Sequence, residues 1–115
     1  DYLRRLDAYT FHEGFAHLLS YQATEIDCVD WHTPQLTEVA AASRAKLRLA
    51  LMETDPDRQK QFLEEAVCGS YYEKFACMCG MLYLADRWEM QGIDGLKSAF
   101  ADYHGFAQRA LSIRI

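Results

Sequence analysis

Apolar residues recur along most of this chain at spacings of three and four, which is the period of an amphipathic helix. No segment alternates for long between apolar and polar residues, as a half-buried strand would. The pattern therefore predicts an all-α protein. We expect five helices, which cover residues 3–23, 34–53, 56–67, 71–91 and 95–112.

Three of these helices begin with a recognisable start signal. Thr33-Pro34 and Asp55-Pro56 each place a side chain that can cap a helix before a proline at the first helical position. The segment Ser70–Glu73 reads S-x-x-E, which is the pattern of a capping box. The stretch 25–33 between the first two helices is polar and is expected to be a loop.

Glycines give further expectations for the second half of the chain. Gly92 suits the C-terminal end of the fourth helix, and Asp94 is placed to cap the fifth. Gly80 and Gly105 fall inside predicted helices. Each of them indicates either a break in the helix or a close packing contact.

The first predicted helix has an apolar side and a polar side. The apolar residues that share one side are Ala8, Phe11, Phe15, Leu18 and Leu19. The opposite side carries Thr10, Glu13, His17, Ser20 and Tyr21. Because Glu13 and His17 are four residues apart, they share a helix face, as a solvated pair or as part of a site.

Composition and charge narrow the class of protein. The chain has 115 residues, of which half are hydrophobic and a quarter are charged, so we expect a single globular domain over residues 1–115. The net charge of −5 argues against nucleic acid as a partner. No apolar run approaches the roughly 18 residues of a membrane helix. The chain begins with Asp1, so we expect either a processed protein or part of a longer catalytic domain.

The four cysteines, Cys28, Cys68, Cys77 and Cys79, do not form a standard zinc pattern. Such patterns usually contain CxxC pairs, whereas Cys77 and Cys79 are two residues apart and point to different sides of a helix. We therefore expect all four to be small buried hydrophobic side chains. Free thiols of this kind are typical of a reducing compartment, which favours a cytoplasmic location.

The segment His12–His17, with the sequence HEGFAH, raises the question of a metal site. Its histidines are five residues apart, so on a regular helix they diverge by about 140° and cannot both reach one ion. A bulge near Gly14 would bring them back to one face. A self-contained site of His12, Glu13 and His17 therefore requires a distorted helix.

Three short motifs resemble the gluzincin zinc metallopeptidases, the aminopeptidase-like group. The segment 13–18 resembles the E-G-x-A motif that carries the third zinc ligand, and 72–75 resembles Y-E-K-G with phenylalanine in place of glycine. The segment 92–96 resembles the loop and leucine that follow. The resemblance spans residues 13–100 and implies the C-terminal helical portion of a gluzincin catalytic domain.

The resemblance implies particular roles for the matching residues. Glu13 would be the third zinc ligand, and His17 would lie one helical turn away as a supporting contact. Tyr72 would donate a hydrogen bond to the oxyanion of the intermediate during peptide hydrolysis. The HExxH helix of the family, with its two histidine ligands and its general base, does not occur in this sequence. A missing N-terminal part of the catalytic domain would have to supply it.

Two other interpretations stay open. In the first, the chain is a non-catalytic helical interaction module, with Glu13 solvated and Tyr72 buried or remote. In the second, the chain holds zinc by itself through His12, Glu13 and His17. The metallopeptidase interpretation predicts instead that Glu13 and Tyr72 face one polar cleft. A ferritin-like di-iron site is disfavoured, because it needs Glu-x-x-His pairs and the sequence has none.

Overall fold

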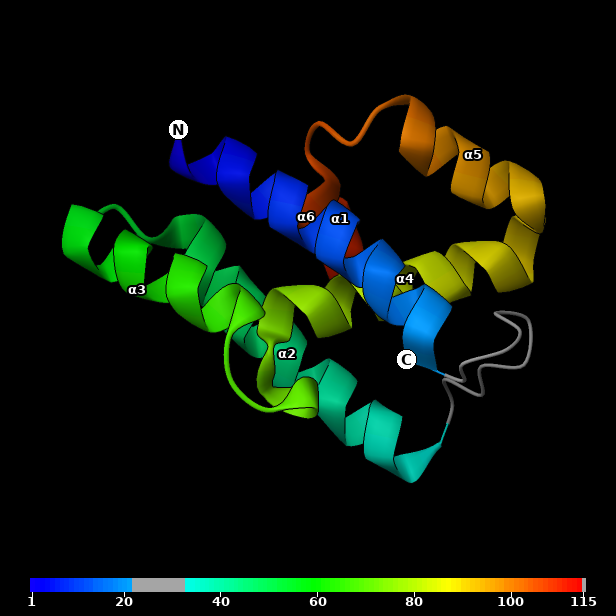
Figure 1. The fold of residues 1–115 in the computed structure, drawn as a ribbon, viewed down its shortest axis with the longest axis horizontal. Coiled ribbons are helices and arrows are strands. Elements are labelled where there is room, and N and C mark those ends of the chain that lie inside the picture. The colour runs from blue at the N-terminus through cyan, green and yellow to red at the C-terminus, as the bar shows by residue number, and fades with distance from the viewer. Residues whose placement is uncertain (22–32, 115) are drawn as a thin grey trace.

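The computed structural model describes residues 1–21 and 33–114, and over these residues the protein is all-α (Figure 1). The expected loop at 25–33 therefore lies almost entirely outside the described residues. The helices are α1 (Tyr2–Tyr21), α2 (Pro34–Met52), α3 (Pro56–Val67), the 3₁₀ turn η2 (Tyr71–Glu73), α4 (Phe75–Gln91), α5 (Ile93–Ala101), α6 (Phe106–Arg109) and the 3₁₀ turn η3 (Ala110–Ser112).

The helix α4 forms the centre of the fold. Its residues 75–86 are all buried, because α1, α2, α3 and α5 cover it from different sides. Figure 1 shows α1 crossing α4 in the foreground, with α2 and α3 packed on one side and α5 on the other. A helix that is covered all round has no polar face, which explains why apolar residues dominate its first three turns.

The helices α1 and α4 approach each other closely where they cross, at Gly14 and Gly80. A Cβ atom added to Gly14 would lie 2.5 Å from the Cα atom of Gly80. A Cβ atom added to Gly80 would lie 1.8 Å from the carbonyl oxygen of Thr10. Both glycines lie inside helices, so unusual backbone angles do not explain them. They are required because the two backbones approach too closely to leave room for a Cβ atom. Of the two alternatives for Gly80, the packing contact is therefore the one observed.

The buried face of α1 differs from the predicted one. Thr10, which was placed on the polar side, is fully buried, and its hydroxyl donates to the carbonyl of Leu6 at 2.7 Å. Leu19, which was placed on the apolar side, is half exposed. The crossing at Gly14 turns the helix so that Leu6, Thr10, Gly14 and Leu18 face α4. As a result, the side of α1 that carries Glu13 and His17 lies at the edge of the core.

The two predicted proline starts are confirmed. The hydroxyl oxygen of Thr33 accepts a hydrogen bond from the backbone N–H of Leu36 at 3.3 Å. The carboxylate of Asp55 accepts one from the backbone N–H of Arg58 at 3.1 Å. Both contacts are local in sequence, which is why the sequence predicts them well.

The predicted helix 71–91 is divided at Lys74, where the backbone leaves the helical region. Its first three residues form η2, and α4 begins at Phe75. The capping box does not form in its usual way: the hydroxyl of Ser70 donates to the carboxylate of Glu73 instead of accepting from a backbone N–H. Gly92 ends α4 as predicted, with φ at 61° and its N–H bonded to the carbonyl of Trp88.

The predicted helix 95–112 is also wrong as a single element. The helix α5 begins at Ile93 after Gly92, without a capping bond from Asp94, and ends at Ala101. The chain then turns at Gly105, whose φ of 74° is left-handed, and continues into α6 and η3. Of the two alternatives for Gly105, a break in the helix is therefore the one observed.

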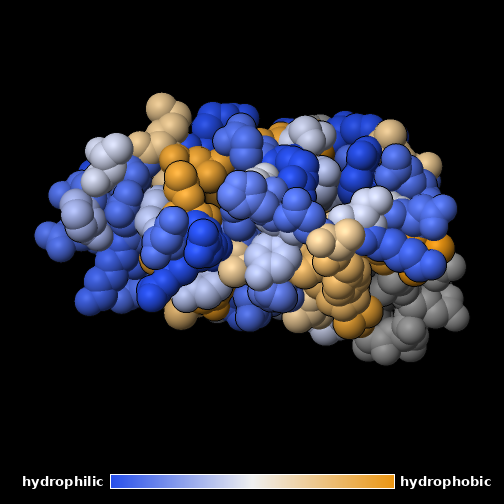
Figure 2. All heavy atoms as spheres, turned by 90° about the horizontal axis from the view of Figure 1, so that it is seen from above, coloured by the Kyte–Doolittle hydropathy of each residue, from blue (hydrophilic) through white to orange (hydrophobic). Residues whose placement is uncertain are grey.

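The face of the molecule drawn in Figure 2 is mainly hydrophilic. Figure 2 shows one face of the molecule, on which hydrophobic areas are separated by polar side chains. The large apolar residues that are exposed come from several helices: Leu3, Leu19, Leu49, Met52, Met90, Ile93 and Phe100. None of the helices in the described part of the chain is long and apolar enough to cross a membrane.

Candidate metal centre

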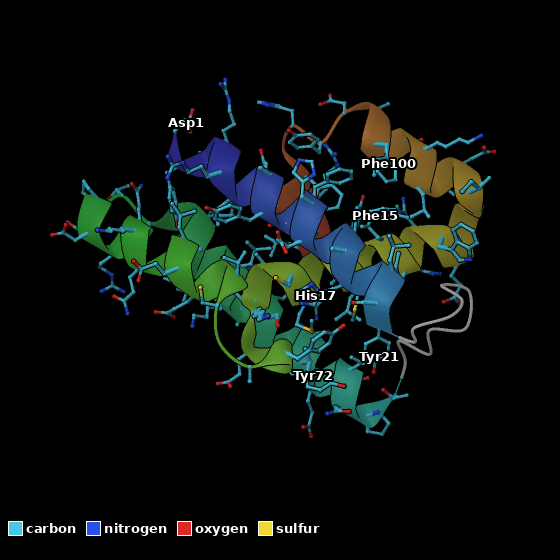
Figure 3. All side chains as sticks on the ribbon, in the orientation of Figure 1. Asp1, Phe15, His17, Tyr21, Tyr72 and Phe100 are labelled. Carbon is cyan, nitrogen blue, oxygen red and sulfur yellow. The ribbon has the colours of Figure 1, made fainter. Side chains whose placement is uncertain are left out.

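Glu13, His17 and Cys77 bring one carboxylate oxygen, one imidazole nitrogen and one sulfur within 4.8 Å of one another. Glu13 and His17 lie one turn apart on α1, and Cys77 lies in the first turn of α4. The glycine crossing explains the meeting, because it holds the two backbones unusually close. Figure 3 shows His17 on the same side of α1 as Tyr72, with Phe15 and Phe100 on the other side.

The imidazole of His17 is oriented by two contacts. Its Nδ1 lies 2.8 Å from the backbone carbonyl oxygen of Glu13. Because a carbonyl oxygen only accepts, Nδ1 carries the proton in this contact, and Nε2 of the neutral ring keeps its lone pair. The ring also packs on the ring of Tyr71, with centroids 4.8 Å apart. A hydrogen bond of this kind commonly fixes the orientation of a metal-binding histidine.

Tyr71 supports the cluster from η2. Its hydroxyl is 3.4 Å from the carbonyl oxygen of His17 and 3.9 Å from the sulfur of Met81. Burial raises the pKa of Tyr71, so its hydroxyl stays a neutral donor at neutral pH. The ring of Tyr72 meets that of Tyr71 edge-on, with centroids 5.2 Å apart.

Cys77 is a buried and protonated thiol. Its sulfur lies 3.5 Å from the carbonyl oxygen of Ala66, to which the S–H donates. Burial, together with the nearby charge of Glu13, raises the pKa of Cys77 to about 11, although Lys74 opposes the shift. A bound cation would reverse this balance, because thiolate sulfur is the form that binds a metal.

The residues predicted for the site are only partly brought together. Glu13 and His17 meet, whereas His12 is exposed and makes edge-on ring contacts to Phe11 and Tyr103. The helix α1 is regular through Gly14, so the bulge that a site of His12, Glu13 and His17 requires is absent from it.

The predicted oxyanion donor Tyr72 lies near the cluster without joining it. It is half-buried on η2, and its ring contact is to Tyr71, which in turn touches His17. The prediction that Tyr72 and Glu13 line one polar cleft therefore stays a prediction.

Sequence reasoning missed Cys77 and Tyr71. No spacing marks them, because their neighbours in the cluster belong to a different helix. The signal that could have found Cys77 is the pair of glycines inside helices, since Gly80 lies one turn after it. The other cysteines were also expected to be buried. This prediction is confirmed for Cys79 and is wrong for Cys68, which is exposed. Cys28 lies outside the described residues.

The three side chains offer the atom types that bind zinc, at separations wider than those of a zinc site. Carboxylate, imidazole and thiolate are all zinc ligands, and thiolate disfavours calcium and magnesium. Tetrahedral zinc with ordinary bond lengths places its ligand atoms about 3.5 Å apart. The side chains would therefore have to close by about 1 Å. Glu13 is exposed, so its side chain has room to change its rotamer.

Comparison of the chain with protein-family models finds no match, and neither curated proteins nor solved structures match it. The candidate centre therefore stands on its geometry and donor chemistry. The resemblance to gluzincin metallopeptidases stays a prediction from three short motifs.

Proposed function

We propose that this helical domain binds zinc through Glu13, His17 and Cys77. The observation that supports the proposal is the convergence of three different zinc-ligand types, from two helices, within 4.8 Å. Unlike the gluzincin pattern, this set needs no HExxH helix from outside the chain. Three protein ligands leave a fourth position open, which is the arrangement of catalytic rather than structural zinc sites.

The experiment is a zinc titration of the metal-free protein against a chromophoric chelator. We expect one zinc per chain, and at least tenfold weaker binding for each of Glu13→Ala, His17→Ala and Cys77→Ala. His12→Ala is the matched control, because it removes a neighbouring imidazole that points elsewhere. Below the pKa of Cys77, zinc must displace the thiol proton, so affinity should rise about tenfold per pH unit.

Cobalt(II) provides a second readout, which reports the thiolate ligand directly. A cobalt ion bound to thiolate has a sulfur-to-metal charge-transfer band in the near ultraviolet, and Cys77→Ser should abolish it. The proposal fails if the protein binds no zinc. It also fails if His12→Ala weakens binding as much as Cys77→Ala, since the ligands would then be those of a distorted HExxxH segment.

We propose peptide hydrolysis as the chemistry of this site, with Tyr72 as the neutral donor to the oxyanion. A zinc ion held by Glu13, His17 and Cys77 would have an open position, and a water bound there would have a pKa near 7. The position of Tyr72, one aromatic ring away from His17, favours this role over a remote one. Peptide would be the substrate partner, as the three motifs imply.

The hydrolysis proposal has its own test. The zinc-loaded protein should cleave a fluorogenic peptide library, and Tyr72→Phe should lower kcat at least tenfold while zinc affinity is unchanged. Tyr71→Phe is the comparison, since its hydroxyl bonds the backbone of α1. Zinc binding without any cleavage would leave a zinc-dependent interaction module, the non-catalytic alternative.

A further inference from the structure

A polar pocket lies between α4, α5 and the end of α6, and it shares no residue with the cluster of Glu13, His17 and Cys77. It has a volume of about 310 Å³, which is at the lower end of the range for small-molecule sites. We call it the arginine pocket. The polar and aromatic residues that line it are Tyr83, Arg87, Gln91, Ser98, Asp102 and Arg109.

Arg87 has an unused donor in this pocket. Among the described residues, its buried Nε has no hydrogen-bond partner, and its Nη2 donates to the sulfur of Met90, at 2.6 Å. Sulfur is a weak acceptor, so the guanidinium lacks the oxygen acceptors that it normally has when it is partly buried. A buried N–H without a partner is costly and rare in native proteins. The ring of Tyr83, 5.7 Å from the guanidinium carbon, holds the group in place.

Arg109 adds a second positive charge that is already fixed. Its guanidinium donates to the carbonyl oxygens of His104 and Asp102, at 2.7 and 3.1 Å, and packs over the ring of Phe106. The carboxylate of Asp102 accepts from the backbone N–H of His104 at 2.9 Å. Two guanidinium groups and one carboxylate therefore give the pocket a net positive charge within an acidic protein.

We propose that the arginine pocket binds a small molecule through a carboxylate or phosphate group. Planar guanidinium donors match both of these oxyanions, and a bound oxyanion would give the Arg87 guanidinium the oxygen acceptors that the described residues do not supply. Gln91 and Ser98 add neutral polar groups, and Tyr83 and Ala99 supply an apolar wall for the rest of the ligand. The proposal is independent of the zinc site, because the two share no residue.

The test is an amide-shift NMR titration of the full chain with inorganic phosphate and, separately, with succinate. We expect saturable shifts around Arg87 and Gly95 with at least one anion. The stronger anion distinguishes a phosphate site from a carboxylate site. Arg87→Gln should weaken binding at least tenfold. Arg87→Lys should weaken it severalfold, because lysine keeps the positive charge and lacks the paired N–H donors of the guanidinium group.

Two further variants make the result specific. Arg48→Gln removes the same charge from an exposed position on α2 and should leave the affinity unchanged. Asp102→Asn keeps an oxygen that accepts from His104 and removes the negative charge, so it should strengthen binding severalfold. The proposal is overturned if neither anion gives saturable shifts, or if Arg48→Gln weakens binding as much as Arg87→Gln.

Discussion

At the scale of single residues, the three described cysteines occupy very different environments. Cys68 is exposed at the C-terminal end of α3, whereas Cys77 and Cys79 are buried in α4. Burial raises the pKa of Cys77 to about 11 and that of Cys79 to about 12. Since only the thiolate reacts with alkylating reagents, the two buried thiols should be almost inert at pH 8.

We therefore expect Cys68 to be alkylated by iodoacetamide at least a hundredfold faster than Cys77 in the metal-free protein at pH 8. The rate for Cys77 should rise about tenfold per pH unit up to about pH 11, as the thiolate fraction grows. Site-resolved mass spectrometry of timed samples measures both rates. Equal rates for the two residues would show that Cys77 is exposed and ionised more easily than its surroundings imply.

The same shift links folding to pH. An unfolded chain ionises this thiol near its ordinary pKa of 9, and the folded chain does so only near 11. The contribution of Cys77 to stability is therefore complete below pH 9. It is lost as the pH rises through the window from 9 to 11, because the unfolded state releases its proton first.

At the scale of helices, the crossing of α1 and α4 depends on the absence of a side chain at Gly80. Alanine is a better helix former by about 1 kcal/mol, so Gly80→Ala would stabilise an open helix position. Here its Cβ atom would strike the carbonyl oxygen of Thr10. We expect a loss of about 3 kcal/mol in the free energy of unfolding, or no folding at all.

Gly69→Ala is the matched control for that measurement. Gly69 has a φ of 110°, and an added Cβ atom would meet no other atom within 4 Å. Its substitution should cost about 1–2 kcal/mol through backbone strain alone. Urea unfolding of both variants measures the difference. A neutral or stabilising Gly80→Ala would contradict the close crossing and the cluster that depends on it.

The short helix α6 receives its cap from α1. Its N-cap residue, Gly105, has no side chain, and the two carboxylate oxygens of Asp7 accept from the backbone N–H groups of Gly105 and Ala107, at 2.9 and 3.0 Å. Asp7→Ala leaves these donors without an acceptor and should cost about 2–3 kcal/mol in urea unfolding. Asp7→Asn keeps one oxygen and should cost less. Equal stability of all three proteins would refute the cap.

These elements also explain which parts of the fold the sequence predicts. The starts at Thr33 and Asp55 follow from residues three positions apart, so local rules are sufficient for them. The end of α5 and the turn into α6 depend instead on Asp7, about a hundred positions earlier in the chain. Helical periodicity alone therefore predicts one helix where the structure has α5, α6 and η3.

At the scale of the whole molecule, the candidate site is less predictable than the fold. Glu13 and His17 could be named from their spacing on one helix, but Cys77 joins them only because two glycines let α1 and α4 meet at one point. The same applies to Arg87 and Arg109, which approach each other after the chain has turned at Gly92 and Gly105. Sites made between helices follow from tertiary packing, which a motif does not encode.

The C-terminal segment closes the fold through a partly buried ion pair. The carboxylate of Asp86 on α4 is 1 % exposed and bonds the guanidinium of Arg114, which is 46 % exposed. The guanidinium of Arg44 on α2 also donates to the carbonyl of Ile113, at 3.0 Å. These contacts hold the end of the chain against α2 and α4, which also pack on each other.

Arg114→Ala should therefore destabilise the protein more than an ordinary surface substitution, because it leaves the Asp86 carboxylate buried and unpaired. We expect a loss of about 2 kcal/mol, below the full cost for a buried pair because Arg114 is half exposed. Asp86→Asn in the Arg114→Ala background should recover part of this loss, since no buried charge then remains. A double-mutant cycle from urea unfolding measures the coupling. If the two substitutions are simply additive, the ion pair does not fix the C-terminal segment, and the contact of Arg44 with Ile113 would be sufficient to hold it.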